Sequence, residues 1–108
     1  MVEHHAQLDR VFGSLSDGTR RDILRRVARR EMSVGEIAAS YDISLAAVSK
    51  HLAVLEKARL VTKRREGKLQ VVGLAPAGLS DAAKHLERMR VLWESRLDRL
   101  EKYLETQP

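Results

Sequence analysis

The chain has 108 residues, of which 32% are charged and only 4% are aromatic, and its formal net charge is +5. This length suits one domain with a modest core that a partner subunit would help to stabilise. The absence of cysteine excludes disulfides, thiolate metal sites and cysteine nucleophiles. No apolar run approaches the roughly 20 residues of a membrane span, and the first residues lack the apolar segment of a secretion signal, so we expect a cytoplasmic protein.

The first third of the chain begins with two predicted helices. A weak first helix covers residues 4–15, with Gly13 near its end, and Ser16 or Asp17 can cap a second helix that runs to about residue 30. The apolar residues expected to face the core are Leu8, Val11, Phe12, Leu15, Ile23, Leu24 and Val27. The second helix also carries six arginines, interpreted as a mainly solvated face or, for one or two of them, as phosphate contacts: Arg20, Arg21, Arg25, Arg26, Arg29 and Arg30.

A short third helix is predicted over residues 34–41. Ser33 before it and Glu36 three residues later form the pattern of a capping box, in which each side chain binds the other residue's backbone amide. The inward residues of this helix are expected to be Ile37, Ala38 and Tyr41.

Residues 42–60 predict the turn and the recognition helix of a helix-turn-helix. Ser44 is the expected N-cap, because its hydroxyl can accept a hydrogen bond from the first turn. Apolar residues recur at steps of three and four and form the predicted buried stripe: Leu45, Val48, Leu52 and Leu55. The opposite arc is small and basic, with Ala46, Lys50, Ala53, Val54 and Lys57 at its centre and Ala47, Ser49 and His51 on its flanks.

After Leu60 the apolar period changes from 3.6 to 2. Residues 61–66 and 69–74 therefore predict two short strands, joined by a tight turn at Gly67 and Lys68. A hairpin directly after a helix-turn-helix is a wing, here spanning 61–74. The predicted fold class is mainly α, a winged helix-turn-helix of about five helices with a two- or three-stranded antiparallel sheet, forming a single domain over 1–108.

The basic excess is confined to this helix and hairpin. Between Ser44 and Lys68 there are seven Lys/Arg against two acidic residues, whereas residues 1–43 hold seven of each and residues 69–108 hold six of each. An excess that lies in one structural unit indicates a surface for a polyanion.

A long final helix is predicted over 79–105, with Pro76 and Gly78 ending the sheet before it. We call its apolar stripe the apolar seam: Leu79, Ala83, Leu86, Met89, Trp93, Leu97, Leu100 and Leu104. We expect its first half to cover the domain's own core and the remainder to pack against the same helix, and the first helix, of a second copy. The predicted dimer interface is Leu8, Phe12, Leu86, Met89, Trp93, Leu97, Leu100 and Leu104.

Two segments carry a family resemblance. LSDGTRRDIL at 15–24 and VSKHLAVLEKARLVTKRREGK at 48–68 resemble the corresponding segments of the ArsR family of winged-helix repressors, over about residues 6–105. Gly18 stands where that family usually has proline. The resemblance implies a homodimeric transcriptional repressor that binds an operator in double-stranded DNA, and it names no inducer for this chain. A two-fold dimer carries two recognition helices, which suits a palindromic operator.

The resemblance also implies which residues meet DNA. On the recognition helix and in the wing they are Ser44, Ala46, Ala47, Ser49, Lys50, His51, Arg64, Arg65 and Lys68, and Lys57 on the same arc completes the predicted set. Lys50 and Ser49 can reach base edges, while the wing cations suit the backbone or minor groove. His51 has two interpretations, a side chain packing at the edge of the core or a hydrogen bond to phosphate or base.

Metal sensing is an alternative that the sequence supports weakly. Ser33 and Gly35 occupy the positions where thiolate sensors of the family have cysteines. Asp81 and His85 are four residues apart and share a helical face, but no histidine follows them, and two protein ligands are too few for a closed zinc site. We therefore predict no metal and no cofactor. A metal-responsive repressor with non-cysteine ligands remains the alternative, with Asp81, His85, His4 and His5 as its candidate ligands.

The sequence also bears on two other function classes. An enzyme is not expected, because no Gly-flanked nucleophile, Gly-rich phosphate loop or HExxH pair occurs in the sequence. A winged helix used only for protein contacts is the second alternative. The cations gathered on one unit between neutral flanks argue against it.

Overall fold

The computed structural model describes residues 2–107, and side chains from His5 to Gln107; the predicted candidate ligand His4 lies outside the described side chains. Within this part of the chain, five helices accompany a three-stranded antiparallel sheet with the order β1-β3-β2. The elements are α1 (Val2–Ser14), α2 (Gly18–Arg29), β1 (Met32–Ser33), α3 (Val34–Ala39), α4 (Leu45–Lys57), β2 (Val61–Glu66), β3 (Leu69–Leu74) and α5 (Pro76–Glu105). The predicted winged helix-turn-helix is confirmed.

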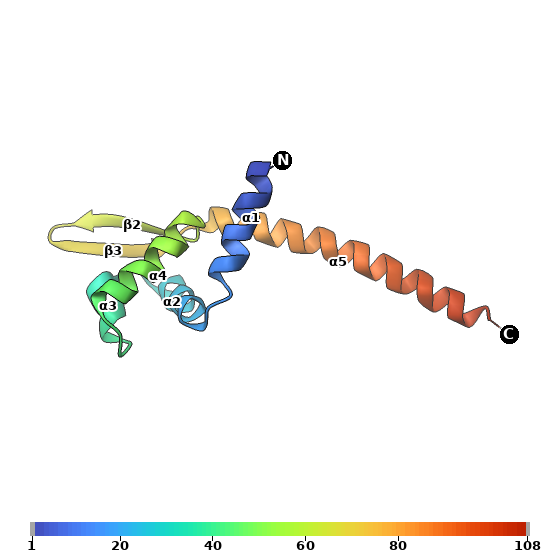
Figure 1. The fold of residues 1–108 in the computed structure, drawn as a ribbon, viewed down its shortest axis with the longest axis horizontal. Helices are drawn as coiled ribbons and strands as arrows, with labels where there is room; N and C mark the ends of the chain where they lie inside the picture. Colours follow the sequence, from blue (N-terminus) through green and yellow to red (C-terminus); the bar gives the residue numbers. More distant parts are fainter. Residues whose placement is uncertain (1, 108) are drawn as a thin grey trace.

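The molecule is elongated. Figure 1 shows a body of α1 to α4, with the β2–β3 hairpin leaving it at one end and α5 at the other. Its principal extents are 71 × 31 × 21 Å, and its Cα radius of gyration is 19.0 Å, against about 13 Å for a compact domain of this length. Most of α5 therefore runs beyond the body. Among the described residues, no helix combines the length and hydropathy that crossing a membrane requires.

The predicted caps determine where the first helices begin. Asp17 accepts a hydrogen bond from the Arg20 amide at the start of α2. Ser33 and Glu36 form the reciprocal capping box of α3, with both hydrogen bonds at 3.1 Å. These caps satisfy first-turn amides that have no partner within the helix. The third helix is shorter than predicted and ends at Ala39.

The core lies between the helices and one face of the sheet. Its fully buried residues include Ile23 of α2, Ile37 of α3 and three residues of the predicted α4 stripe, Val48, Leu52 and Leu55. The prediction that Leu45 is buried was wrong, because this residue is 60% exposed. Leu45 is the first residue of α4. Periodicity gives the direction of a side chain, but it does not show whether another element reaches the end of the helix.

A third strand precedes α3 at the point where the sequence showed only a break in the helical period. Met32 and Ser33 pair with Val72 and Val71 of β3, and Met32 is buried. Two residues are too few to show a period of 2, so the sequence pattern could not predict this strand.

The hairpin agrees with the prediction residue for residue. β2 pairs with β3 from Val61 opposite Leu74 to Glu66 opposite Leu69, which leaves a two-residue turn. Gly67 has φ +61°, while Lys68 has no positive φ. This matches the φ requirement of a type II′ turn, whose first central residue is best supplied by glycine.

The start of α5 differs from the prediction. The helix begins at Pro76, not at Leu79, and Pro76 occupies the first turn, where a missing amide proton does no harm. Gly78 does not end the sheet; its amide donates to the Arg59 carbonyl at 2.9 Å. A Cβ at position 78 would lie 2.3 Å from the Ala58 carbonyl oxygen, so glycine is required for this close approach.

The face of α5 that covers the body is not the apolar seam. Gly78 and Ala82 are its buried residues, and the His85 ring lies 6.0 Å from that of Phe12 in α1. The seam residues Leu79 and Leu86 are 47% and 53% exposed. The expectation that the first half of the seam covers the core was therefore wrong, because α5 is rotated so that a neighbouring row of small residues meets the body.

Candidate nucleic-acid interface

The outer arc of α4 faces solvent. Its buried stripe anchors the helix to the body, and the side chains of Ala46, Ser49, Lys50 and Lys57 on the other side are exposed. Ala47 and His51 are half-buried on the flanks, as their positions at the edges of the arc predict. The arc thus presents small and basic side chains on a helix whose opposite face is packed against the core.

The N-terminus of α4 is open to solvent. Ser44 is exposed, and its hydroxyl oxygen accepts a hydrogen bond from the Ala47 amide at 3.1 Å. The hydroxyl proton is then available for donation outward. Together with the positive end of the helix dipole, this arrangement suits an anion such as a phosphate.

The wing contains both neutralised and unpaired cations. Arg64 forms ion pairs with Glu31 and, at 3.1 Å, with Glu66, and Lys63 lies 3.6 Å from Glu56. Arg64 was predicted to meet DNA on equal terms with Arg65 and Lys68. Without DNA, its guanidinium contacts both carboxylates, whose hydrogen bonds and charges raise its pKa, with Glu31 the largest cause. The DNA contact of Arg64 stays a prediction.

Five cations of the 44–68 segment have no ion-pair partner among the described side chains. They are Lys50, Lys57, Arg59, Arg65 and Lys68. Arg65 makes only a neutral contact, in which its Nε donates to the Gly67 carbonyl at 3.3 Å. Both acids of the segment are ion-paired, Glu56 with Lys63 and Glu66 with Arg64. The unpaired positive charge of the segment therefore lies on these five residues.

His51 contacts the start of α2. Its Nδ1 lies 3.4 Å from Nη1 of Arg20 and 3.9 Å from a carboxylate oxygen of Asp17. The His51 side chain is 23% exposed. Sequence reasoning missed the Arg20 contact, although both residues belong to the two segments that carry the family resemblance.

Most arginines near α2 form the exposed face that was expected, and only Arg20 is half-buried. Asp22 partly offsets their charge. Arg25 and Arg26 both pair with Asp22, and Arg26 also lies over the Tyr41 ring, with its guanidinium carbon 5.3 Å from the ring centroid. Tyr41 donates its hydroxyl to Asp22, which ties the turn after α3 to α2. These hydrogen bonds, that of Tyr41 first, hold the pKa of Asp22 far below its ordinary value, and burial raises the pKa of Tyr41.

The candidate metal ligands do not converge. Among the described residues, no three His, Cys, Asp or Glu side chains are placed to hold one ion. Asp81 and His85 are both half-buried on α5, and His85 packs against the Phe12 ring. His5 belongs to α1 and joins no such group.

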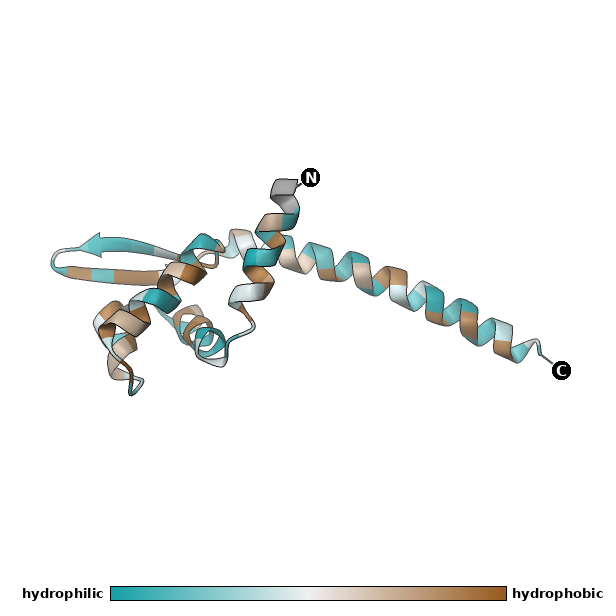
Figure 2. Ribbon diagram, viewed as in Figure 1, coloured by the Kyte–Doolittle hydropathy of each residue, from teal (hydrophilic) through white to brown (hydrophobic). Residues whose placement is uncertain are grey.

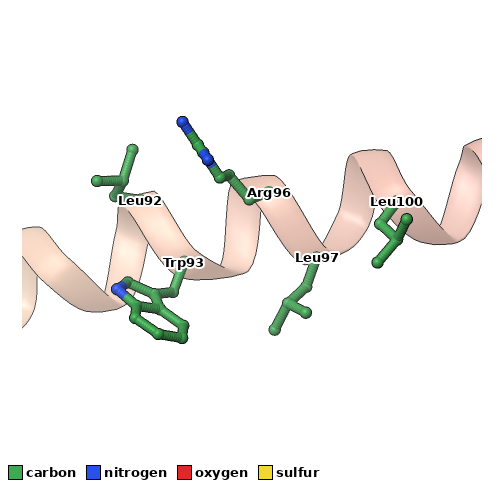
Figure 3. Close-up of a pocket in the computed structure, with 5 residues that line it drawn as sticks. All are labelled: Leu92, Trp93, Arg96, Leu97 and Leu100. Carbon is green, nitrogen blue, oxygen red and sulfur yellow. The ribbon is translucent and has the colours of Figure 1, made fainter.

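The outer part of α5 exposes its apolar residues. Figure 2 shows hydrophobic residues recurring along the whole projecting helix, and Trp93, Leu97, Leu100 and Leu104 of the seam are 53–63% exposed. A shallow groove there is lined only by α5 side chains, with Trp93 and Leu97 pointing to one side and Leu92 and Arg96 to the other (Figure 3).

The α1 side of the predicted interface is less open than α5. Leu8 is only 7% exposed because it is buried against its own protomer, whereas Phe12 is 37% exposed. Leu8 therefore has little surface left for a second copy. Among the predicted interface residues, those of α5 and Phe12 remain accessible.

Comparison with known sequences places the chain among transcriptional regulators. A helix-turn-helix domain family matches residues 15–64. The chain is 45% identical to the HTH-type transcriptional regulator Rv2034 of Mycobacterium tuberculosis, over 74% of this chain and 75% of that protein. It is 33% identical to the transcriptional repressor SdpR of Bacillus subtilis, over 69% of this chain and 83% of that protein.

Solved structures share the fold. An ArsR-like transcriptional regulator from Rhodococcus sp. RHA1 superposes with a TM-score of 0.82 at 32% identity, covering 95% of this chain and 97% of that one. The homodimeric winged helix-turn-helix DNA-binding domain Mb0332 of Mycobacterium bovis gives a TM-score of 0.63 at 31% identity, covering 87% and 84%. The chain therefore belongs to the ArsR family of winged helix-turn-helix transcriptional regulators, and it is a DNA-binding regulator.

Proposed function

We propose that the protein is a homodimeric transcriptional repressor that binds a palindromic operator through the α4 helices of both copies. The observation that carries the proposal is the outer arc of α4, which is exposed, small and basic, beside unpaired wing cations. A duplex presents a dense row of phosphates around base edges. This surface has the opposite charge, and an exposed helix can enter the major groove.

Each part of the surface has a separate role in the proposed complex. Ser44 and the N-terminus of α4 bind a phosphate oxygen, and Lys50 and Ser49 contact base edges in the major groove. Ala46 and Ala47 allow close approach and touch a thymine methyl. Arg65 and Lys68 in the wing, together with Lys57, bind the backbone and position the protein without reading sequence.

The second copy is supported by the projecting half of α5. A helix with a continuous exposed apolar stripe needs a partner to bury it. The described part of the chain supplies none, since α5 extends past the body. A second α5 presents the same stripe by two-fold symmetry. The homodimeric state of the Mb0332 domain supports the same arrangement.

A two-fold dimer presents two copies of α4 to DNA. Their half-sites are then related by a palindrome, with centres about one helical turn, roughly 10 bp, or a small multiple apart. Repression is the proposed direction of regulation, since a dimer bound across a promoter would block polymerase. The relative named SdpR, a transcriptional repressor, supports this direction.

Binding to duplex DNA at different salt concentrations tests the proposal. If each copy neutralises three to five phosphates, log affinity falls with log salt at a slope of about −5 to −9. A flat dependence would show that the cations of α4 and the wing do not meet a nucleic acid.

A further inference from the structure

Arg20 lies at the junction of three helices. Its Nε donates to the Ser14 carbonyl at 2.7 Å and its Nη2 to the Gly13 carbonyl at 3.3 Å, both in the last turn of α1. Its own amide donates to the Asp17 side chain that caps α2. The positive guanidinium thus occupies the negative end of the α1 dipole while its backbone belongs to α2.

The third arm of this guanidinium reaches the recognition helix. A guanidinium is planar and rigid, so the two carbonyls that hold Nε and Nη2 also fix the direction of Nη1. Nη1 lies 3.4 Å from Nδ1 of His51 in α4. Arg20 thereby links the end of α1 and the start of α2 to a residue of the candidate DNA surface.

The chemistry of this contact selects one form of the imidazole. Arginine has five N–H donors, no acceptor and no accessible neutral form, so Nδ1 can take part only as an acceptor. A neutral ring with a bare Nδ1 carries its proton on Nε2, on the opposite side of the ring. Nε2 has no hydrogen-bond partner among the described side chains.

The carboxylate of Asp17 is the competing neighbour of Nδ1. It lies farther away, at 3.9 Å, and already accepts the Arg20 amide at 3.0 Å. A proton on Nδ1 would point toward this carboxylate but would also face the Arg20 cation. The shorter contact to Arg20 and the occupied carboxylate favour the bare Nδ1.

We propose that Arg20 is a positioning residue for DNA binding, which orients His51 so that Nδ1 accepts from Arg20 and the Nε2 proton is directed outward to a phosphate oxygen. This inference deepens the proposed function and rests on it for the phosphate contact. The state of the imidazole in the free protein does not depend on it. This role also gives a function to the LSDGTRR segment. Its first arginine, Arg20, is remote in sequence from the recognition helix.

The imidazole state is tested without DNA by measuring the ¹⁵N shifts of His51 in the wild-type protein at neutral pH. The expected result is an Nδ1 signal in the range of an unprotonated, hydrogen-bonded nitrogen and an Nε2 signal in the protonated range. In Arg20→Gln both signals should move toward the average of the two tautomers. A protonated Nδ1 in the wild-type protein would overturn the proposal in favour of the Asp17 contact.

The positioning role is tested by DNA affinity, with Arg21→Gln as the matched control. Arg21 also donates to a carbonyl near the end of α1, that of Leu15 at 2.7 Å, but among the described residues it forms no hydrogen bond with His51. Arg20→Gln should weaken binding about three- to tenfold more than Arg21→Gln, and equally on operators of different sequence. Equal losses for the two variants would contradict the role.

His51→Gln provides the rescue. A glutamine amide can donate outward near the Nε2 position without help from Arg20, so Arg20→Gln should then weaken binding no more than Arg21→Gln does. If Arg20→Gln weakens DNA binding in the His51→Gln background as much as it does with His51 present, Arg20 acts independently of His51. If the wild-type protein binds no DNA, the proposed function fails, and the ¹⁵N measurement still decides the Arg20 contact.

Discussion

Arg64 of β2 is bound to Glu31, which precedes β1, although β3 lies between these two strands. Arg64 Nη2 donates to Glu31 Oε1 at 3.0 Å. Gly73 of β3 permits this crossing, because a Cβ there would lie 2.7 Å from a Glu31 carboxylate oxygen. The hydrogen bond from Arg64 holds the pKa of Glu31 below its ordinary value. Arg64 therefore ties the wing to the body, and its charge is neutralised inside the protomer.

This pairing predicts different effects for the two neighbouring wing arginines. Arg65→Gln removes an unpaired cation and should reduce the magnitude of the salt slope of DNA binding by about 2 for a dimer, about 1 for each copy. Arg64→Gln should leave the slope nearly unchanged, because its charge is already balanced. The measurement is affinity titration over a range of salt concentrations. Equal reductions for both variants would show that Arg64 leaves Glu31 when DNA binds.

Lys50 is the candidate for direct base contact on α4. Lys50→Ala should lose roughly 1–3 kcal/mol of operator affinity and relax the sequence preference at one position of each half-site. Competition between operator variants measures both effects. Lys84→Ala, an exposed lysine on α5, is the control and should change neither. Uniform weakening on all sequences would assign Lys50 to the phosphates.

The apolar seam can be tested with two aspartates on one helix. Leu97 and Val91 are similarly exposed, at 58% and 54%, but Val91 lies off the seam on another side of α5. Leu97→Asp should shift the protein to monomer in sedimentation, since a buried unpaired carboxylate is strongly unfavourable at an interface. Val91→Asp should remain dimeric. A dimer that survives Leu97→Asp would place the interface elsewhere.

Two glycines in helices should respond in opposite ways to alanine. Gly78→Ala places a Cβ against the Ala58 and Arg59 carbonyls and should destabilise the protein by about 1–3 kcal/mol, as overpacking does. Gly13→Ala has no atom within 4 Å of the added Cβ and should stabilise the protein by about 0.5–1 kcal/mol through helix propensity. Denaturant unfolding measures both. A neutral Gly78→Ala would mean that the α4–α5 junction can relax.

Local signals in the sequence predicted much of this fold. Asp17, Ser33 and Ser44 are caps because each side chain binds an amide within three residues, and such contacts depend on nearby residues alone. The hairpin was equally local, since the change of period and the turn at Gly67 are sufficient to define it. The buried residues of α4 followed from periodicity in the same way.

Features that depend on distant neighbours could not be read from the sequence. The rotation of α5, which buries Ala82 and leaves Leu86 exposed, is set by the close approach of Gly78 to the end of α4. The pairing of Arg64 with Glu31 spans 33 residues, and that of Arg20 with His51 spans 31. Charge counting treated Arg64 as equal to Arg65, because counting does not show which cations a fold neutralises.

The most direct test of the central claim is selection of bound duplexes from a random pool. A homodimer that reads DNA through two copies of α4 should enrich one sequence as an inverted repeat, with half-site centres about 10 bp or a small multiple apart. Leu97→Asp should weaken that enrichment together with dimerisation. Enrichment of an unrepeated site, or of no sequence at all, would contradict the account.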